Sequence, residues 1–152
     1  MKGGVFMTDY KALAAAAKNL TDGVKHLTAN LANLSALICG AMEDVSWVGF
    51  YLMEDGRLVL GPFQGKPACI EIPLGKGVCG AAASSGKTVR VRDVREFKGH
   101  IACDAASRSE IVVPIKKDGK VVAVLDVDSA TVGRFTEEDE KGLEAVAKVI
   151  KF

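Results

Sequence analysis

Apolar residues at helical spacing mark the first third of the chain. They recur every three or four positions: Val24, Leu27, Leu31, Leu34 and Ile38. Residues 12–17 add an alanine-rich stretch of strong helix formers. We therefore expect helix from Thr8 to about Cys39, broken or kinked at Gly23 and stopped at Gly40.

After Val45 the pattern changes to the period of two that is typical of strands. Strands are expected at 47–53, 57–60, 69–72, 88–91, 110–115 and 120–128. Turns that contain glycine, at 54–56 and 117–119, predict two hairpins. The stretch 61–67, with its two glycines and two prolines, is interpreted as a loop or a bulged edge.

Two further helices and a long loop complete the predicted order. Small residues at 78–86 predict a short helix, and Thr136 with Asp139 predicts the capped start of a final helix. A polar connection spans 92–106 between two strands. Because the strands are joined mainly by hairpins, we expect an α+β domain. Its antiparallel sheet of about six strands would carry the N- and C-terminal helices on one face.

Composition narrows the functional classes. A length of 152 residues suits one domain, and we expect a flexible start at 1–7 followed by a single domain at 8–152. Lys and Arg number 20 against 19 Asp and Glu, so the basic excess typical of nucleic-acid binding is missing. The sequence contains no run of about eighteen apolar residues, so no membrane span is predicted. With no visible targeting signal, the expected location is the cytoplasm, where thiols stay reduced.

Four cysteines are the first candidates for chemistry: Cys39, Cys69, Cys79 and Cys103. Cys39 lies on the apolar side of a predicted helix and is interpreted as a core residue. The other three lie beside turns or loops, and no pair has the C-x-x-C spacing of a zinc ribbon or a thioredoxin motif. A structural role for each, thiol redox chemistry, and a zinc site completed by His100 are the alternatives.

Among these cysteines, Cys103 has the predicted surroundings that most favour a reactive thiolate. The residues after it are expected to open a helical turn, whose free N–H groups would stabilise a thiolate. His100 lies three positions earlier. It either assists the thiolate or is a solvated loop histidine.

Asp126 and Asp128 share one face of an otherwise apolar strand. They are either a solvated strand end or a buried pair that needs a cation or a bound proton.

The register of Glu110 decides whether it joins them. If the hairpin turn holds two residues, 118–119, Glu110 faces Val127 and points away from both aspartates. If the turn holds three residues, 117–119, with a left-handed glycine, Glu110 lies opposite Asp126 on the same face. We predict the second form and hence a cluster of three carboxylates. Such a cluster suits a ligand with an ammonium group, and one carboxyl could stay protonated as a general acid.

Trp47 and Tyr51 are four residues apart on a predicted strand and also share a face. They are either core residues or the wall of a small apolar box for a ligand. The glycine-rich stretch 75–80 lacks the spacing of a phosphate-binding loop, so it does not predict nucleotide binding.

Five segments together resemble the free methionine-(R)-sulfoxide reductases, which are stand-alone GAF domains. They are WVGFYL at 47–52, GPFQGKPAC at 61–69, GKGVCG at 75–80, GHIACDAAS at 99–107 and EIVVPI at 110–115. The resemblance covers roughly residues 30–150 and includes a trio of cysteines that ordinary GAF domains lack. A non-catalytic GAF sensor of small molecules, and a redox-sensing or zinc-binding interaction protein, remain as alternatives.

The resemblance implies a mechanism for free methionine-R-sulfoxide. Cys103 would attack the sulfoxide sulfur and become a sulfenic acid. Cys69, or else Cys79, would resolve it to a disulfide that thioredoxin reduces. Glu110, Asp126 and Asp128 would bind the substrate ammonium and help to protonate the departing oxygen, and Trp47 and Tyr51 would box its methyl end. The resemblance also implies a homodimer, and no bound cofactor or metal is expected.

Overall fold

The computed structural model describes residues 7–152, so residues 1–6 of the expected flexible start lie outside it. Its elements, in chain order, are α1 (Tyr10–Thr21), α2 (Leu27–Ala41), β1 (Trp47–Glu54), β2 (Arg57–Gln64), β3 (Glu71–Pro73), α3 (Gly77–Ser85), β4 (Val89–Val91), the 3-10 turn η1 (Val94–Glu96), β5 (Ser109–Lys117), β6 (Lys120–Ser129) and α4 (Glu137–Lys148). None of the helices in residues 7–152 is long and apolar enough to cross a membrane.

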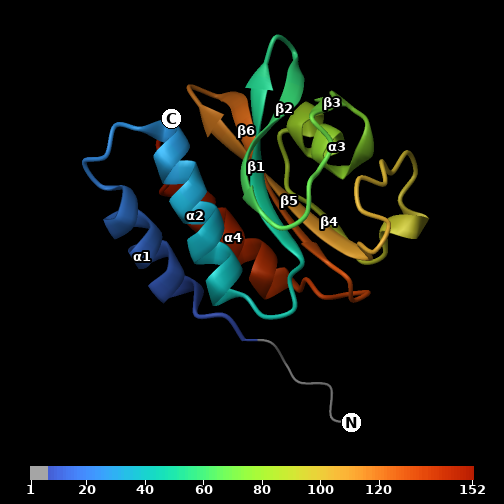
Figure 1. The fold of residues 1–152 in the computed structure, drawn as a ribbon, viewed down its shortest axis with the longest axis horizontal. Helices are drawn as coiled ribbons and strands as arrows, with labels where there is room; N and C mark the ends of the chain where they lie inside the picture. The colour runs from blue at the N-terminus through green and yellow to red at the C-terminus, as the bar shows by residue number, and fades with distance from the viewer. Residues whose placement is uncertain (1–6) are drawn as a thin grey trace.

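The strands form one antiparallel sheet in the order β3-β2-β1-β6-β5-β4. Helix α2 packs on β1 and β2, α4 packs on β5, and α1 lies against both helices (Figure 1). Helix α3 packs against β5 and β6 on the opposite face of the sheet. A second cluster of core residues lies there. The predicted α+β class, with the terminal helices on one face, is confirmed.

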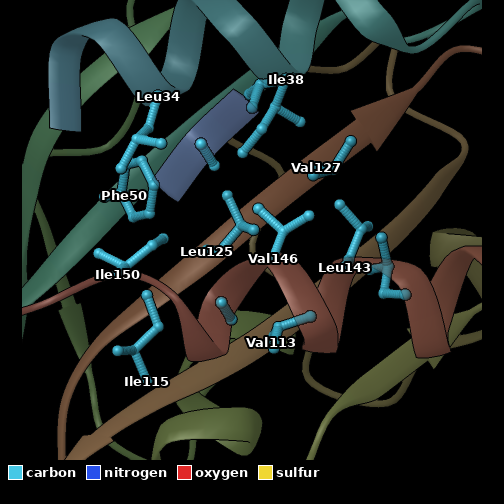
Figure 2. Close-up of a cluster of buried hydrophobic side chains, with 14 of the residues drawn as sticks. Leu34, Ile38, Phe50, Val113, Ile115, Leu125, Val127, Leu143, Val146 and Ile150 are labelled. Atoms are coloured by element: carbon cyan, nitrogen blue, oxygen red, sulfur yellow. The ribbon is translucent and has the colours of Figure 1, made fainter. Parts of the chain in front are cut away.

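Alternation along the strands gives each face its own core. On the helix side, Phe50, Val113, Leu125 and Val127 meet α2 and α4 (Figure 2). Their neighbours in sequence point the other way: Tyr51, Val112 and Val124 belong to a second cluster beneath α3. The central strands β1, β5 and β6 are therefore covered on both faces along most of their length.

The predicted N-terminal helix is broken in two. α1 ends at Thr21, and Gly23 adopts a φ of +71°, which a glycine accepts at little cost. α2 continues through Gly40 to Ala41, one residue beyond the predicted stop. At the other end of the chain, Thr136 and Asp139 form the predicted capping box of α4.

The stretch 61–67 divides between a strand and a loop. β2 runs on to Gln64, and its pairing with β1 shifts by one residue between Gly49 and Tyr51, so the bulged alternative is correct for the first half. β3 is shorter than predicted and begins only at Glu71, which leaves Cys69 in the loop before it.

The predicted three-residue turn of the last hairpin is wrong, although Glu110 does lie on the same face as Asp126 and Asp128. Asp118 and Gly119 alone form the turn, both with positive φ, and Lys117 pairs with Lys120. That turn by itself would place Glu110 opposite Val127. The pairing then shifts, with Lys116 opposite Val121 but Ile115 opposite Ala123.

Val122 is therefore an extra residue in β6, a bulge. Val122 and Ala123 both pack on the helix side, as the bulge requires, whereas Val121 packs beneath α3. One added residue reverses the faces beyond it. Glu110 pairs with Asp128, not Asp126, and all three carboxylates share the α3 face.

Candidate active site

A cavity on the α3 face gathers the predicted site residues. Those that line it are Trp47, Tyr51, Cys79, Cys103, Glu110, Asp126 and Asp128. The remaining one, Cys69, lies beside the cavity because it is bonded to Cys103. β1, β5 and β6 supply the floor, α3 one wall, and the loops before β3 and β5 the rim.

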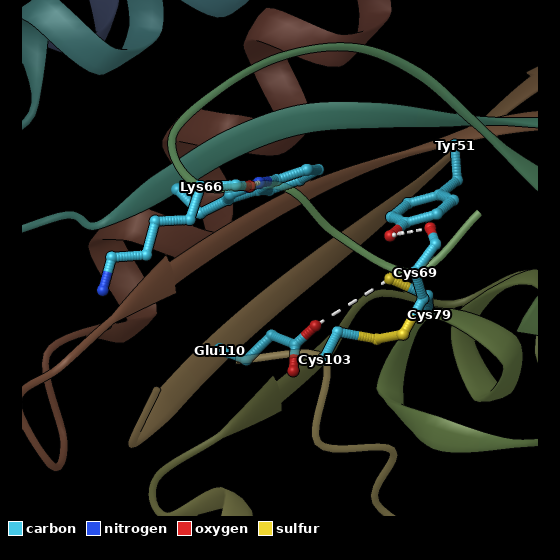
Figure 3. Close-up of a disulfide and its surroundings, with 7 residues drawn as sticks. Tyr51, Lys66, Cys69, Cys79, Cys103 and Glu110 are labelled. Carbon is cyan, nitrogen blue, oxygen red and sulfur yellow. Dashed lines mark hydrogen bonds between the residues drawn. A yellow bond between two sulfur atoms is a disulfide. The ribbon is translucent and has the colours of Figure 1, made fainter. Parts of the chain in front are cut away.

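A disulfide joins Cys69 to Cys103, with a Cα–Cα distance of 5.5 Å across 34 positions of sequence (Figure 3). Cys79 remains a buried free thiol, and Cys39 is a free, partly exposed thiol on α2. Since two of the three loop-side sulfurs are bonded to each other, the zinc site with His100 is not formed in this structure. His100 is on the cavity rim, where partial burial lowers its pKa.

The residues after Cys103 form one hydrogen-bonded turn but no helix. Residues 104–107 form a single turn, closed by Ser107 N–H donating to the Asp104 carbonyl at 3.2 Å. The Asp104 carboxylate also accepts from Ala106 N–H at 2.9 Å. The N–H groups of Ala106 and Ser107 are thus satisfied within the loop and are not available to a thiolate at Cys103.

The three carboxylates lie together on the α3 face, where Glu110 and Asp126 are buried and Asp128 is partly exposed. Glu110 is 7% exposed and Asp126 is 6% exposed, and ligand atoms of both lie within 4.8 Å of the Cys79 sulfur. Burial raises the pKa of Glu110. Burial and then the neighbouring carboxylates raise the pKa values of Asp126 and Asp128 well above the ordinary range. One oxygen of Asp126 has no hydrogen-bond partner among residues 7–152.

Cys79 forms part of the same cluster. Its sulfur donates to Glu110 Oε1 at 3.8 Å from the first turn of α3 (Figure 3). Burial and the adjacent carboxylates raise the pKa of the Cys79 thiol, so it stays protonated and weakly nucleophilic.

The aromatic wall is wider than predicted. Trp47 stacks on Tyr51 at 6.0 Å between ring centroids, and on Phe63 at 5.1 Å. Ser107 is a further polar residue of the cavity, since its Oγ donates to Asp128 at 3.3 Å. Sequence reasoning assigned no role to Phe63 or Ser107. Their contacts join segments far apart in sequence, so no local spacing signals them.

Comparison with known proteins agrees with this geometry. The profile of the GAF domain family matches residues 28–152. Free methionine-R-sulfoxide reductase of Escherichia coli is 51% identical over 94% of this chain and 83% of its own length. The reduced form of fRMsr of Staphylococcus aureus is 50% identical, with a TM-score of 0.92 over 96% of each chain.

A complex with substrate is also among the similar structures. It is the free methionine-R-sulfoxide reductase from Neisseria meningitidis, which is 41% identical with a TM-score of 0.89, over 98% of this chain and 93% of that one.

Proposed function

Since the chain belongs to the free methionine-R-sulfoxide reductases, a family of GAF-domain oxidoreductases, we propose how its cavity reduces free methionine-R-sulfoxide to methionine. The chain is also 47% identical to the free methionine-R-sulfoxide reductase of Saccharomyces cerevisiae, over 88% of this chain and 78% of that protein. This similarity favours an enzyme over a non-catalytic sensing module. The substrate would occupy the cavity beside Cys103.

The buried carboxylates support this proposal most directly. None of the ion pairs found within residues 7–152 includes Glu110, Asp126 or Asp128. Burying carboxylates without a cation is costly. The ammonium group of a free amino acid supplies that cation, whereas a peptide-bound methionine has none. The rings of Trp47 and Tyr51 then face the methyl end of the substrate.

The first step transfers oxygen to Cys103. Its thiolate attacks the sulfoxide sulfur and forms an S–S bond with it. The oxygen then passes from the substrate sulfur to Cys103 Sγ while this S–S bond breaks, so methionine leaves with its sulfur reduced by two electrons. Cys103 is oxidised to the sulfenic acid and carries the oxygen. Asp126 and Asp128, whose pKa values are raised by burial and by the neighbouring carboxylates, are the proposed source of the proton that goes to the departing oxygen.

Cys69 resolves the sulfenic acid in the second step. Its sulfur attacks Cys103 Sγ, the S–S bond forms, and the S–O bond breaks to release water after protonation. The bond between Cys69 and Cys103 in the structure supports this choice over Cys79. The raised pKa of Cys79 makes it a poor attacking group, so we assign it to the cavity floor.

The cycle closes when an external dithiol reduces the disulfide. Thioredoxin is the proposed reductant, and the reducing cytoplasm is the proposed location. No cofactor or metal is required by these steps. The homodimer stays a prediction from the resemblance.

A stereospecific turnover assay tests the function. With thioredoxin, thioredoxin reductase and NADPH, the protein should consume free methionine-R-sulfoxide and leave the S form untouched. Cys103→Ser should abolish turnover. Cys39→Ser, which removes a thiol outside the cavity, should retain it. Absence of turnover with the R form in the wild-type protein would refute the proposed function.

A further inference from the structure

The loop that carries Cys69 has little regular structure of its own. Residues 65–70, called the strap, join β2 to β3 and include Gly65, with a φ of +134°, and Pro67. Resolution of the sulfenic acid nonetheless requires the Cys69 sulfur to reach Cys103. What holds the strap therefore matters for that step.

Three hydrogen bonds join the strap to the sheet. Tyr51 Oη donates to the Cys69 carbonyl at 2.9 Å (Figure 3), and Trp47 Nε1 donates to the Lys66 carbonyl at 3.0 Å. The Leu60 N–H donates to the Ile70 carbonyl at 2.8 Å. Two of the three thus come from the aromatic side chains of the predicted substrate wall.

Both donors are rigidly held. Trp47 is 6% exposed and Tyr51 is 2% exposed, and both rise from β1, which is paired on both sides by β2 and β6. The stacking of Trp47 between Tyr51 and Phe63 fixes the indole plane.

Two glycines allow the indole to lie this close. A Cβ at Gly49 would meet the Trp47 ring at 2.7 Å, and a Cβ at Gly65 would meet it at 2.6 Å. The indole is therefore enclosed between β1 and the strap, with its N–H directed at the strap backbone. A side chain at either glycine would displace it.

We propose that Trp47 and Tyr51 are positioning residues for Cys69, holding the strap so that its sulfur meets Cys103 as soon as the sulfenic acid forms. This rests on the function proposed above. Their ring faces line the cavity, whereas their polar atoms bind the strap. Losing those bonds lets the strap sample more conformations, which lowers the effective concentration of the Cys69 thiol at Cys103.

The sulfenic acid lifetime on Cys103 tests the proposal. The reduced full chain, wild type or Tyr51→Phe, is mixed with one equivalent of methionine-R-sulfoxide without reductant. Dimedone labelling and mass spectrometry follow the sulfenic acid and the disulfide, and chromatography follows methionine. Tyr51→Phe keeps the ring and loses one hydrogen bond, so the sulfenic acid should persist about fivefold longer relative to methionine release.

Two further variants control the result. Trp47→Phe should also lengthen the lifetime, because it keeps a ring but lacks the indole donor. Tyr10→Phe removes a buried tyrosine hydroxyl outside the cavity and should leave the lifetime unchanged. Dithiothreitol, which reduces the sulfenic acid directly, should bring steady-state turnover of Tyr51→Phe closer to wild type than thioredoxin does.

An unchanged lifetime in both cavity variants overturns the positioning role. Equal slowing of methionine release and of disulfide formation does so too, since that indicates only a distorted cavity. If the wild type releases no methionine, the proposed function has failed instead. The two failures are therefore distinguishable.

Discussion

At the start of α4, Arg134 and Asp139 form a buried ion pair at 3.1 Å, whereas on the opposite side of the sheet Glu110 and Asp126 are buried beside Asp128. None of these three carboxylates forms an ion pair within residues 7–152. Asp139 also accepts from the Tyr10 hydroxyl at 2.6 Å and caps α4. Arg134 Nε donates to the Glu43 carbonyl. The first group ties α1, α4 and the loop after α2 together.

The difference between the two groups separates structure from function. A buried carboxylate that is neutralised and fully hydrogen-bonded holds a fold together, and removing its partner leaves an uncompensated charge. A buried carboxylate cluster without a cation is costly to the folded protein, and a ligand that brings a cation relieves that cost. The extent of burial alone does not tell which of the two groups is structural and which is functional.

The largest expected effect comes from breaking the paired group. Asp139→Ala should lower the free energy of unfolding by about 3–5 kcal/mol, since it removes the buried ion pair with Arg134, the hydrogen bond from Tyr10 and the capping box of α4 together. Tyr10→Phe should cost only about 1 kcal/mol, because the ion pair survives. Chemical denaturation measures both values. Comparable losses for the two variants would contradict the comparison, as would a large loss of kcat/KM in the folded Asp139→Ala fraction.

The reverse outcome is expected in the cavity. Asp126→Asn should lower kcat/KM by about 10- to 100-fold, because one charged contact to the substrate ammonium is lost. The free energy of unfolding at neutral pH should stay the same or rise, because the raised pKa of Asp126 makes this carboxyl unfavourable in the folded state, whereas an amide does not titrate. Steady-state kinetics and denaturation of the same sample decide. A variant that is strongly destabilised but fully active would place Asp126 with the structural group.

The last expected effect is a gradual dependence of stability on pH. The pKa of Asp126 in the folded protein is raised well above its ordinary value of 3.8. Between these two values the folded state holds a proton that the unfolded state has released. Stability should therefore fall as pH rises from about 4 through the folded pKa, by at most about 1.4 kcal/mol per pH unit for each proton.

Asp126→Asn removes one of these protons, so its stability should depend less on pH over the same window. Denaturation of both proteins at a series of pH values makes the comparison. Parallel curves for wild type and variant would show that Asp126 titrates as it does in the unfolded chain.

The carboxylate cluster shows how far sequence reasoning reached. Alternation along β6 places Asp126 and Asp128 on one face whatever the register, since that depends only on neighbouring residues. The position of Glu110 depends on the pairing of two strands. The glycine of the turn suggested a three-residue loop, but the shift came from the bulge at Val122. The cluster was therefore predicted correctly from an incorrect turn.

By itself, the sequence determined the features that neighbouring residues encode. These are the break at Gly23, the capping box at Thr136, the alternation of the strands and hence the antiparallel α+β class. Their physical basis is local: backbone freedom, end groups of a helix, and periodic burial.

Only the tertiary structure decided the contacts between distant segments. The bulge at Val122, the bond between Cys69 and Cys103, and the hydrogen bond from Tyr51 to the strap all depend on how both faces of the sheet are filled. Packing chooses among registers and loop conformations of similar local energy. The residue types of the cavity can therefore be read from the sequence, whereas their contacts with one another depend on tertiary packing.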